Sequence, residues 1–281
     1  MKDKSKIILI VVILAVAALI AFICYGFIKG NKNPVVTMVV SYKDANGNEK
    51  TGTVKMELNT KMAPNTVTNF IQLANNGYYD GVTFHRIVSD FVVQGGDKEG
   101  TGSGSARFSD INKSVIANSD KDYKYSIDGE FIANGFNNTM KFEKGVVGMA
   151  RSDFSTYGLT EEGYNSGSAQ FFIVTTDNKA QLNNLNMSYA PFGKVIEGYE
   201  YIEEIANLYG KTEDANTDEA TAENKDNENV PKMTSVRVET FGVNYGLPKV
   251  NNYDKIMQTV NQTQSYYQQL MNSYSTSTTN Q

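Results

Sequence analysis

The longest apolar stretch of the chain lies near its N-terminus, where residues 7–28 (IILIVVILAVAALIAFICYGFI) contain no charged side chain. A helix of this length can cross the hydrocarbon core of a membrane, which is about 30 Å thick. Three lysines within residues 1–6 precede it, so the positive-inside rule predicts a cytoplasmic N-terminus and an extracytoplasmic remainder. We therefore expect a single-pass protein of the cell membrane, anchored by residues 7–28.

Two other interpretations of this stretch stay open. A cleaved signal peptide usually has an apolar core of about 7–15 residues and ends at a small-x-small site. The stretch here is longer and no good site follows, which favours a retained anchor. Lipid attachment at Cys24 is the second alternative, although Ile23 stands where a small residue is usual.

Beyond a short polar linker, residues 29–34, the apolar pattern changes to the two-residue period of strands. Residues 35–58 contain two β-rich runs around the polar turn DANGN at 44–48, which predicts a hairpin. Further strand-like runs follow at 82–88, 91–94, 146–150, 170–175, 190–195 and 235–243. Many short strands with few helices favour a barrel or a sandwich.

Two segments have the period of a helix. Residues 63–76 place Pro64 in the first turn, and Gly77 follows as a C-terminal cap. The apolar side chains of this helix recur at i, i+3, i+4 and i+7: Val67, Phe70, Ile71 and Ala74. A second, shorter helix is predicted at residues 199–208.

We expect one domain over residues 35–247, interrupted by three polar insertions at 105–125, 153–167 and 211–229. The last of these carries many more acidic residues than its two lysines and has almost no apolar residue, which is typical of a solvated or disordered loop. The tail, residues 248–281, is rich in Asn, Gln, Ser, Thr and Tyr, with apolar residues at helical spacing. A disordered tail and a helix that docks on something both fit this pattern.

Composition excludes several kinds of chemistry. The net charge of -5, without a basic cluster, argues against a nucleic-acid surface. One cysteine excludes an intrachain disulfide, and one histidine, His85, excludes a His-rich metal site. The start of a calcium loop at Asp44 lacks its glycine, because Glu49 stands there, and the glycine-rich run 95–104 lacks the Lys-Ser/Thr of a phosphate loop. We expect no metal ion and no cofactor.

Arg86 lies in residues 84–97, FHRIVSDFVVQGGD, where a charged guanidinium stands among strand-type apolar residues. This segment resembles a signature of the cyclophilins, the peptidyl-prolyl isomerases. Four more segments resemble that family in the same order: APNTVTNFIQLANNGYYDG (63–81), GEFIANGFNNTMKFEKGVVGMARS (129–152), GSAQFFIVT (167–175) and APFGKVIEGYEYIEEI (190–205). The ordered matches span residues 36–244. The resemblance implies a mainly β fold, a closed eight-stranded antiparallel β-barrel capped by two α-helices, here preceded by one transmembrane helix.

The resemblance also implies which residues form the site. Arg86 would be the catalytic guanidinium, and Gln94 would orient it or the substrate backbone. The proline pocket and the substrate-backbone contacts would come from Phe91, Val92, Ala150, Arg151, Gln170, Phe172, Leu185 and Tyr189. The two-residue strand period should bring Arg86 to the face of Gln94, while His85 would be a hydrogen-bonded framework residue.

Some positions depart from the family pattern. Val92, Arg151 and Tyr189 stand where Met, Asn and His are common, and Asn184 stands where many eukaryotic members have Trp. The last difference puts binding of cyclosporin-type peptides in doubt. Arg86 itself matches the pattern.

The isomerisation of an X-Pro bond requires little more than a charged hydrogen-bond donor such as the Arg86 guanidinium. An X-Pro bond rotates slowly because resonance gives its C–N bond a barrier of about 18–20 kcal/mol. A guanidinium can favour the twisted imide without a base or a metal. We expect a monomeric folding catalyst that acts on proline-containing segments of exported proteins. A module that binds such segments as a chaperone or scaffold, with little turnover, is the alternative.

Overall fold

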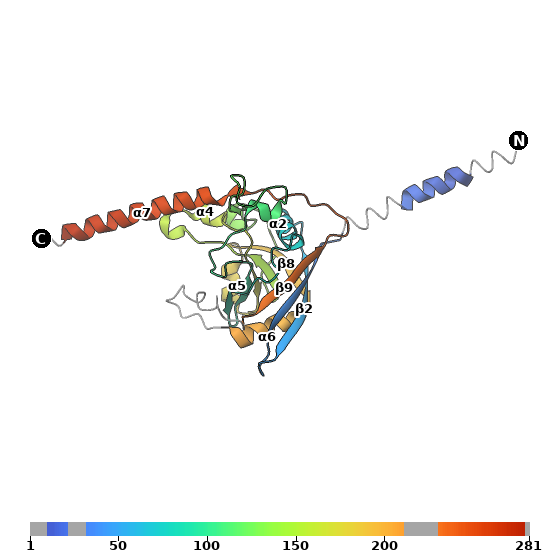
Figure 1. Ribbon diagram of the computed structural model, residues 1–281, viewed down its shortest axis with the longest axis horizontal. Helices are drawn as coiled ribbons and strands as arrows, with labels where there is room; N and C mark the ends of the chain where they lie inside the picture. Colours follow the sequence, from blue (N-terminus) through green and yellow to red (C-terminus); the bar gives the residue numbers. More distant parts are fainter. Residues whose placement is uncertain (1–9, 22–31, 211–229, 279–281) are drawn as a thin grey trace.

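The computed structural model describes residues 10–21, 32–210 and 230–278 (Figure 1). Its strands are β1 (Val35–Lys43), β2 (Glu49–Leu58), β3 (Arg86–Val88), β4 (Val92–Gly95), β5 (Tyr125–Ser126), β6 (Val146–Met149), β7 (Phe171–Val174), β8 (Ala190–Glu197), β9 (Lys232–Glu239) and β10 (Asn251–Asn252). Its labelled helices are α2 (Pro64–Asn75), α3 (Phe108–Ile111), η1 (Ile132–Asn134), η2 (Ser155–Tyr157), α4 (Thr160–Tyr164), α5 (Lys179–Leu185), α6 (Tyr199–Tyr209) and α7 (Tyr253–Thr278).

The hairpin predicted at residues 35–58 is confirmed. β1 and β2 pair in antiparallel fashion from Val35 opposite Glu57 to Lys43 opposite Glu49. In the turn, the Asp44 carboxylate accepts hydrogen bonds from the backbone N–H groups of Asn46 (2.8 Å) and Asn48 (2.9 Å). An aspartate that binds its own following backbone stabilises a tight reversal of the chain.

Eight strands form one antiparallel sheet in the order β3-β4-β7-β6-β8-β2-β1-β9. The sheet curls, because the residues just before β3 meet the start of β9. Gly81 N–H donates to the Met233 carbonyl (2.7 Å), and Met233 N–H donates to the Val82 carbonyl (2.8 Å). Thr83 and Lys232 form a single bridge there. A continuous ladder that closes a barrel remains a prediction.

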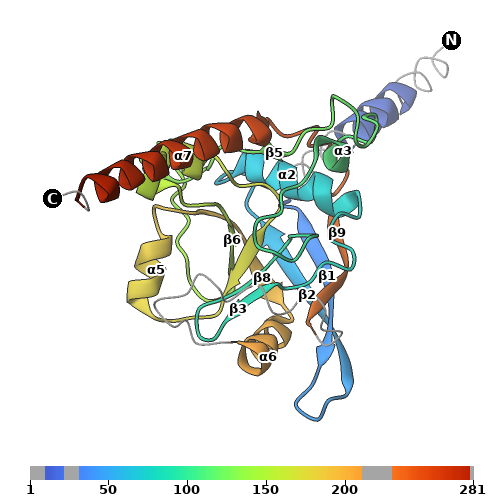
Figure 2. The same ribbon diagram turned by 60° about the vertical axis from the view of Figure 1, so that its left-hand side comes forward.

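The core lies inside the curled sheet, between the two predicted helices. Alternate hairpin side chains are fully buried: Val36, Met38, Val40, Val54, Met56 and Leu58. α2 buries the apolar stripe predicted for it, and its Phe70 ring lies 5.1 Å from the ring of Tyr79 and 5.4 Å from that of Phe171. α6 buries Ile202 and Ile205. The two helices cover opposite ends of the sheet (Figures 1 and 2).

Two of the three predicted insertions have defined structure. Residues 105–125 contain α3, and the buried Asp122 carboxylate holds the loop by accepting from the N–H groups of Ser109 (2.9 Å) and Asn118 (2.7 Å). Residues 153–167, predicted as a polar insertion, contain the short helices η2 and α4. The acidic segment 211–229 lies outside the described residues.

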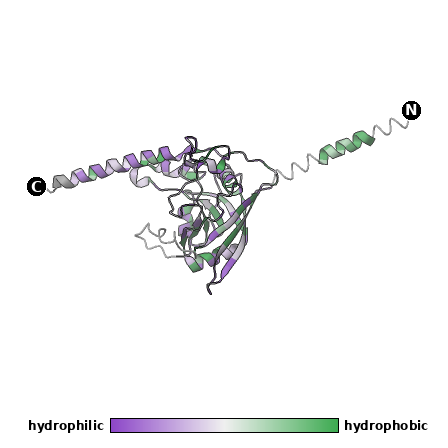
Figure 3. Cartoon of the chain, viewed as in Figure 1, coloured by the Kyte–Doolittle hydropathy of each residue, from purple (hydrophilic) through white to green (hydrophobic). Residues whose placement is uncertain are grey.

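Part of the predicted anchor is described. Residues 10–21 form a helix whose apolar character stands out in Figure 3, and its large side chains are exposed, with Leu14 at 64%. Within the described ranges, no helix is both long enough and apolar enough to span a membrane. Residues 1–9 and 22–31, including Cys24, lie outside the description.

The C-terminal region runs back along the domain before it ends in a long helix. The Asn65 side chain holds the Lys249 backbone, accepting from its N–H (2.8 Å) and donating to its carbonyl (2.9 Å). β10 then pairs with β5, and α7 follows directly. The buried Val260 docks the first half of α7, and the rest extends beyond the body (Figures 1 and 2).

α2 lacks a side-chain cap of its own, because Ala63 occupies the N-cap position. The buried Glu130 supplies one from far along the chain, accepting from the backbone N–H groups of Asn65 (2.9 Å) and Thr66 (2.8 Å). Burial raises the pKa of Glu130, although these two bonds oppose the shift. A carboxylate at a helix N-terminus satisfies orphan donors and complements the helix dipole.

We predict that Glu130→Ala lowers the free energy of unfolding by about 1–3 kcal/mol, because it removes a helix cap and leaves two donors unpaired. Denaturant unfolding followed by circular dichroism measures the change. Glu200→Ala is the matched control, since Glu200 is exposed in the first turn of α6 and should change stability far less. Equal effects from the two substitutions would contradict the capping role.

Candidate active site

Arg86 and Gln94 face each other across the β3–β4 pair. The register places Arg86 directly opposite Gln94, as the two-residue period predicts, and the turn between the strands has Asp90 in the left-handed region (φ 52°). Arg86 Nη1 donates to Gln94 Oε1 at 3.4 Å, and both side chains are half-buried. The guanidinium therefore lies at the surface of the sheet instead of in the core.

A chain of amide hydrogen bonds fixes the partner of Arg86. Gln94 Nε2 donates to Gln170 Oε1 (3.0 Å), which lies beside it just before β7. Gln170 Nε2 in turn donates to the carbonyls of Gly102 and Gly104, at 2.9 Å each. Because each amide uses its N–H group on the next member, the oxygen of Gln94 is left to face the guanidinium.

The loop that anchors this chain is built around the buried carboxylate of Asp97. Its oxygens accept from the backbone N–H groups of Glu99 (2.8 Å), Thr101 (2.9 Å), Gly102 (2.7 Å) and Gly104 (3.1 Å). A side chain at Gly104 would bring a Cβ atom within 1.8 Å of the carboxylate. The glycine-rich run 95–104 therefore folds around the buried Asp97 carboxylate.

His85 differs in one respect from the expectation. Its ring is buried, as a framework role requires, but neither ring nitrogen has a hydrogen-bond partner within the described part of the chain. Burial lowers the pKa of His85, and the Asp97 carboxylate only partly opposes this shift. The shift favours the neutral ring, and the hydrogen bond predicted for His85 is not formed by either ring nitrogen among the described residues.

An apolar cluster lies next to Gln94, the partner of Arg86, because Gln94 pairs with Phe172 between β4 and β7. Six predicted residues belong to this cluster: Phe91, Val92, Ala150, Phe172, Leu185 and Tyr189. The Phe172 ring lies 5.6 Å from the Tyr189 ring, edge to face. Its members are aromatic and aliphatic, with no charge among them, as the predicted proline pocket requires.

Sequence reasoning missed several walls of this pocket. Phe142 stacks on Phe172 with ring centres 5.6 Å apart, and Met140, Val146 and Leu182 also line the cluster. Phe142 and Met140 lie in an irregular segment, where no periodicity marks a buried face. Their place in the family-like segment 129–152 was the available signal.

Arg151 lies at the rim of the site, but its guanidinium is turned toward other protein groups. Its charge packs over the rings of Tyr189 (4.8 Å), Tyr164 (5.0 Å) and Phe131 (5.8 Å). Its Nε donates to the Ser188 carbonyl and its Nη1 to the Ser152 carbonyl, both at 2.9 Å. Arg151 therefore holds the Tyr189 wall in position, and the predicted contact with substrate backbone stays a prediction.

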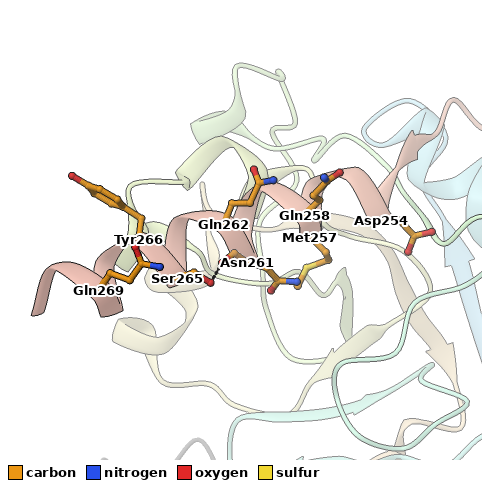
Figure 4. A pocket seen from close by; sticks show the side chains of 8 residues that line it. All are labelled: Asp254, Met257, Gln258, Asn261, Gln262, Ser265, Tyr266 and Gln269. Atoms are coloured by element: carbon orange, nitrogen blue, oxygen red, sulfur yellow. Dashed lines mark hydrogen bonds between the residues drawn. The ribbon is translucent and has the colours of Figure 1, made fainter. Parts of the chain in front are cut away.

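Two hollows lie outside the apolar cluster and differ in their relation to the site. A polar cavity of about 140 Å³ borders Gln94, Ala150, Arg151 and Gln170 on one side and Tyr253 on the other. Tyr253 was predicted only as part of the helical pattern of the tail, not as a neighbour of the site. The second hollow runs along α7, is lined by α7 residues only, and has no residue in common with the site (Figure 4). Among the described residues, no three His, Cys, Asp or Glu side chains gather as a metal site would require.

Comparison with known proteins identifies the family of the chain. Residues 44–238 match the family model described as cyclophilin type peptidyl-prolyl cis-trans isomerase/CLD. A Staphylococcus aureus (strain USA300) protein, which its name assigns to the peptidyl-prolyl cis-trans isomerases, is 31% identical over 170 residues, covering 56% of this chain and 77% of that protein. A "Peptidyl-prolyl cis-trans isomerase-like 2" of Emericella nidulans is 35% identical over 147 residues, covering 52% and 20%.

Among solved structures, a Cryptosporidium parvum cyclophilin type peptidyl-prolyl cis-trans isomerase aligns with a TM-score of 0.45 and 22% identity, covering 72% of this chain and 98% of that one. The family match includes every residue predicted for the site. It ends before β10 and α7, which lie outside it.

We predict that Asp97→Asn lowers the free energy of unfolding at neutral pH by about 2–4 kcal/mol, because a buried, charge-assisted acceptor is lost. Burial by itself would raise the pKa of Asp97, but the backbone hydrogen bonds and nearby His85 outweigh it, so the pKa lies below the usual 3.8. The folded protein thus binds this proton less readily than the unfolded chain. Stability is full above pH ~4 and is lost as the pH falls further.

Denaturant unfolding over a series of acidic pH values tests both statements. The loss of stability on acidification should be smaller for Asp97→Asn than for the wild type, since the variant has no carboxyl there to protonate. Asp120→Asn, at an exposed position, serves as control and should keep the wild-type profile. An Asp97→Asn profile equal to that of the wild type would refute the role of the carboxylate.

Proposed function

Since the chain belongs to the cyclophilin-type peptidyl-prolyl cis-trans isomerase family, we propose that it accelerates rotation about X-Pro bonds with Arg86 as its catalytic guanidinium. The observation that carries this proposal is the position of Arg86, hydrogen-bonded to Gln94, which itself pairs with Phe172 of the apolar cluster. A proline ring in that pocket would place its imide bond within reach of the guanidinium.

The pocket supplies binding energy that does not depend on the isomer. The proline ring is apolar, and each buried CH2 group contributes about 0.8 kcal/mol. Because the ring fits the pocket in both the cis and the trans form, this energy holds the substrate without favouring either planar state. Acceleration therefore needs a further interaction that strengthens only when the bond twists.

Arg86 provides that interaction. Twisting the imide breaks its resonance and leaves a lone pair on the prolyl nitrogen, which the forked guanidinium can bind together with a substrate carbonyl. A tenfold rate increase requires about 1.4 kcal/mol, and a charge-assisted hydrogen bond in a partly dry groove exceeds this. The amide chain from Gln94 to Gln170 keeps the guanidinium from moving away as the substrate rotates.

We further propose that the domain acts outside the cytoplasm on exported proteins, held to the membrane by residues 7–28. The uncharged stretch and the three preceding lysines support this placement. The exposed apolar side chains of the helix at residues 10–21 support it as well, because such a surface is costly in water. Unfolded exported chains would meet the site as they emerge.

We predict that the full-length protein in detergent accelerates isomerisation of an X-Pro peptide and that Arg86→Ala lowers kcat/KM by about 100-fold or more, as expected for loss of a transition-state donor. A protease-coupled assay measures both. Arg86→Lys should retain part of the activity, because charge remains but the planar fork is lost.

Arg237→Ala is the matched control: Arg237 lies on β9, is hydrogen-bonded to Asp80 and belongs neither to the apolar cluster nor to the polar cavity, so this variant should keep wild-type activity. His85→Ala should lose much less than Arg86→Ala. If the wild-type protein did not raise the isomerisation rate above the uncatalysed rate, the enzyme proposal would be wrong. A module that binds proline-containing segments would then be the better interpretation.

For the membrane proposal, we predict that the full chain expressed in bacterial cells stays in the membrane fraction after an alkaline carbonate wash. Protease added to spheroplasts should digest the domain. The double substitution Leu14→Arg and Ala18→Arg should release the protein, because each charge at the centre of a span costs about 2.5–3.5 kcal/mol. The matched control Ser5→Arg lies outside the apolar stretch and should remain bound. A wild-type chain recovered in the soluble fraction at its full mass would refute anchoring.

A further inference from the structure

One row of side chains on α7 begins against the domain and continues beyond it. Tyr253, Val260, Tyr267 and Tyr274 recur every seven residues, which places them on one side of the helix. Tyr253 and Val260 are buried, and the Tyr267 ring lies 6.4 Å from the ring of Tyr157 in η2. Farther along the row, Tyr274 is 64% exposed. The row that docks α7 is therefore longer than the surface on which it docks.

The exposed end of this row has the same pattern in both directions of the chain. Residues 267–274 read YQQLMNSY, with a tyrosine at each end and Leu270 and Met271 at the centre. Steps of three and four residues place these four side chains, which we call the symmetric stripe, on one side of the helix. Leu270 is partly exposed, and Met271 is 69% exposed. A stripe with this symmetry is self-complementary, as the interface of a two-fold dimer must be.

The helix that carries the symmetric stripe has little intrinsic stability. Asn, Ser, Thr and Tyr make up most of residues 261–278, and these residues form helices less readily than Ala or Leu. No charged side chain occurs in residues 256–281, so no ion pair between successive turns supports the helix. Helices of proteins gain most of their stability when an apolar face packs on a partner. The symmetric stripe is the face on which such packing can occur.

The lack of charge favours a second copy of the chain as this partner. Charged side chains beside an apolar seam make identical helices repel and select unlike partners. Amides and hydroxyls border the symmetric stripe instead, and each of these groups both donates and accepts hydrogen bonds. A helix that lies on a membrane surface usually carries Lys and Arg on its polar face, and this segment has neither.

The direction of pairing follows from the symmetry of the stripe and from the position of the domain. In an antiparallel pair, a two-fold axis between Leu270 and Met271 places Leu270 opposite the second copy's Met271. The same axis places Tyr267 opposite the second copy's Tyr274. A parallel pair would bring both domains to the same end, where each already covers the first half of its own row (Figure 2).

The size of the symmetric stripe determines how tightly two copies can associate. An aromatic side chain buries at most about 150–250 Å². Two tyrosines, a leucine and a methionine from each copy therefore approach the roughly 800 Å² per partner of a standard interface without exceeding it. Association through this stripe should thus be specific but reversible, with a dimer fraction that rises with protein concentration.

We propose that two copies of the chain form a two-fold dimer through antiparallel pairing of α7 along the symmetric stripe. A dimer differs from the monomer expected from the sequence. It places two domains at opposite ends of one assembly, so that a long unfolded chain can contact both. Binding at one domain would then raise the local concentration of the chain at the other.

The first test measures the mass of the full-length protein in detergent by sedimentation, over about a hundredfold range of concentration. The wild type should shift from one chain to two. Leu270→Glu brings like charges together at the two-fold axis and should raise the dimer dissociation constant about tenfold or more. Gln269→Glu is the matched control, because it adds the same charge to the same helix on the face that borders the hollow in Figure 4. This variant should associate as the wild type does.

The second test determines the register by oxidative cross-linking, with Cys24→Ala as the background. Leu270→Cys should cross-link to its own copy, because both copies of this residue lie beside the axis. Tyr274→Cys should not, because its two copies lie about 10 Å apart along the helices, beyond the reach of a disulfide. A mixture of Tyr267→Cys and Tyr274→Cys proteins should cross-link, and Gln269→Cys, on the other face, should not.

A wild type that stays monomeric at every concentration would overturn the proposal. So would a dimer that Leu270→Glu leaves intact, because the anchor or another surface would then hold it. Self-cross-linking of Tyr274→Cys as efficient as that of Leu270→Cys would refute the antiparallel register. The cross-links decide the question if Leu270→Glu unfolds the end of α7. Isomerisation of a short X-Pro peptide is measured separately, so an active monomer would refute only the dimer, and an inactive dimer only the catalysis.

Discussion

The pairing of β3 with β4 is the constraint on which the site depends. The strands place Arg86 opposite Gln94, and a slip by one residue would turn every side chain of the strand to the other face. A guanidinium in the core would lose its hydration without a partner, at a cost of several kcal/mol. The register thus serves stability and chemistry together, because the one arrangement that keeps the charge out of the core also presents it beside the apolar pocket.

Support for this register comes from polar groups behind the strands. Gln94 is bound by Gln170, Gln170 by the backbone of Gly102 and Gly104, and that loop by the Asp97 carboxylate. Each member is satisfied by the next, so the chain of hydrogen bonds has few alternative arrangements. A catalyst that must stabilise a twisted bond benefits from donors already in place, since no reorganisation is then needed as the substrate rotates.

Much of this could be predicted from the sequence where periodicity or turn chemistry is strong. The hairpin at 35–58, the stripe of α2 and the Arg86–Gln94 register all follow from local patterns. The Phe142 wall, the short helices within 153–167 and the unpartnered ring of His85 do not, because they depend on packing between distant segments. The position of Tyr253 could not be predicted for the same reason. It depends on the hydrogen bond between Asn65 and the Lys249 backbone and on the pairing of β10 with β5.

The pairing of the first strand with the last has a consequence for how the protein is made. β1 joins β9, so that Val36 lies opposite Val238, about 200 residues later in the chain. On a ribosome the hairpin emerges early, and the free edge of β1 stays unpaired until almost the whole domain has been synthesised. Long-range strand pairing is also slow to form. A protein of this family would then itself spend its first moments as an incompletely folded chain, open to the same aggregation that folding catalysts counteract.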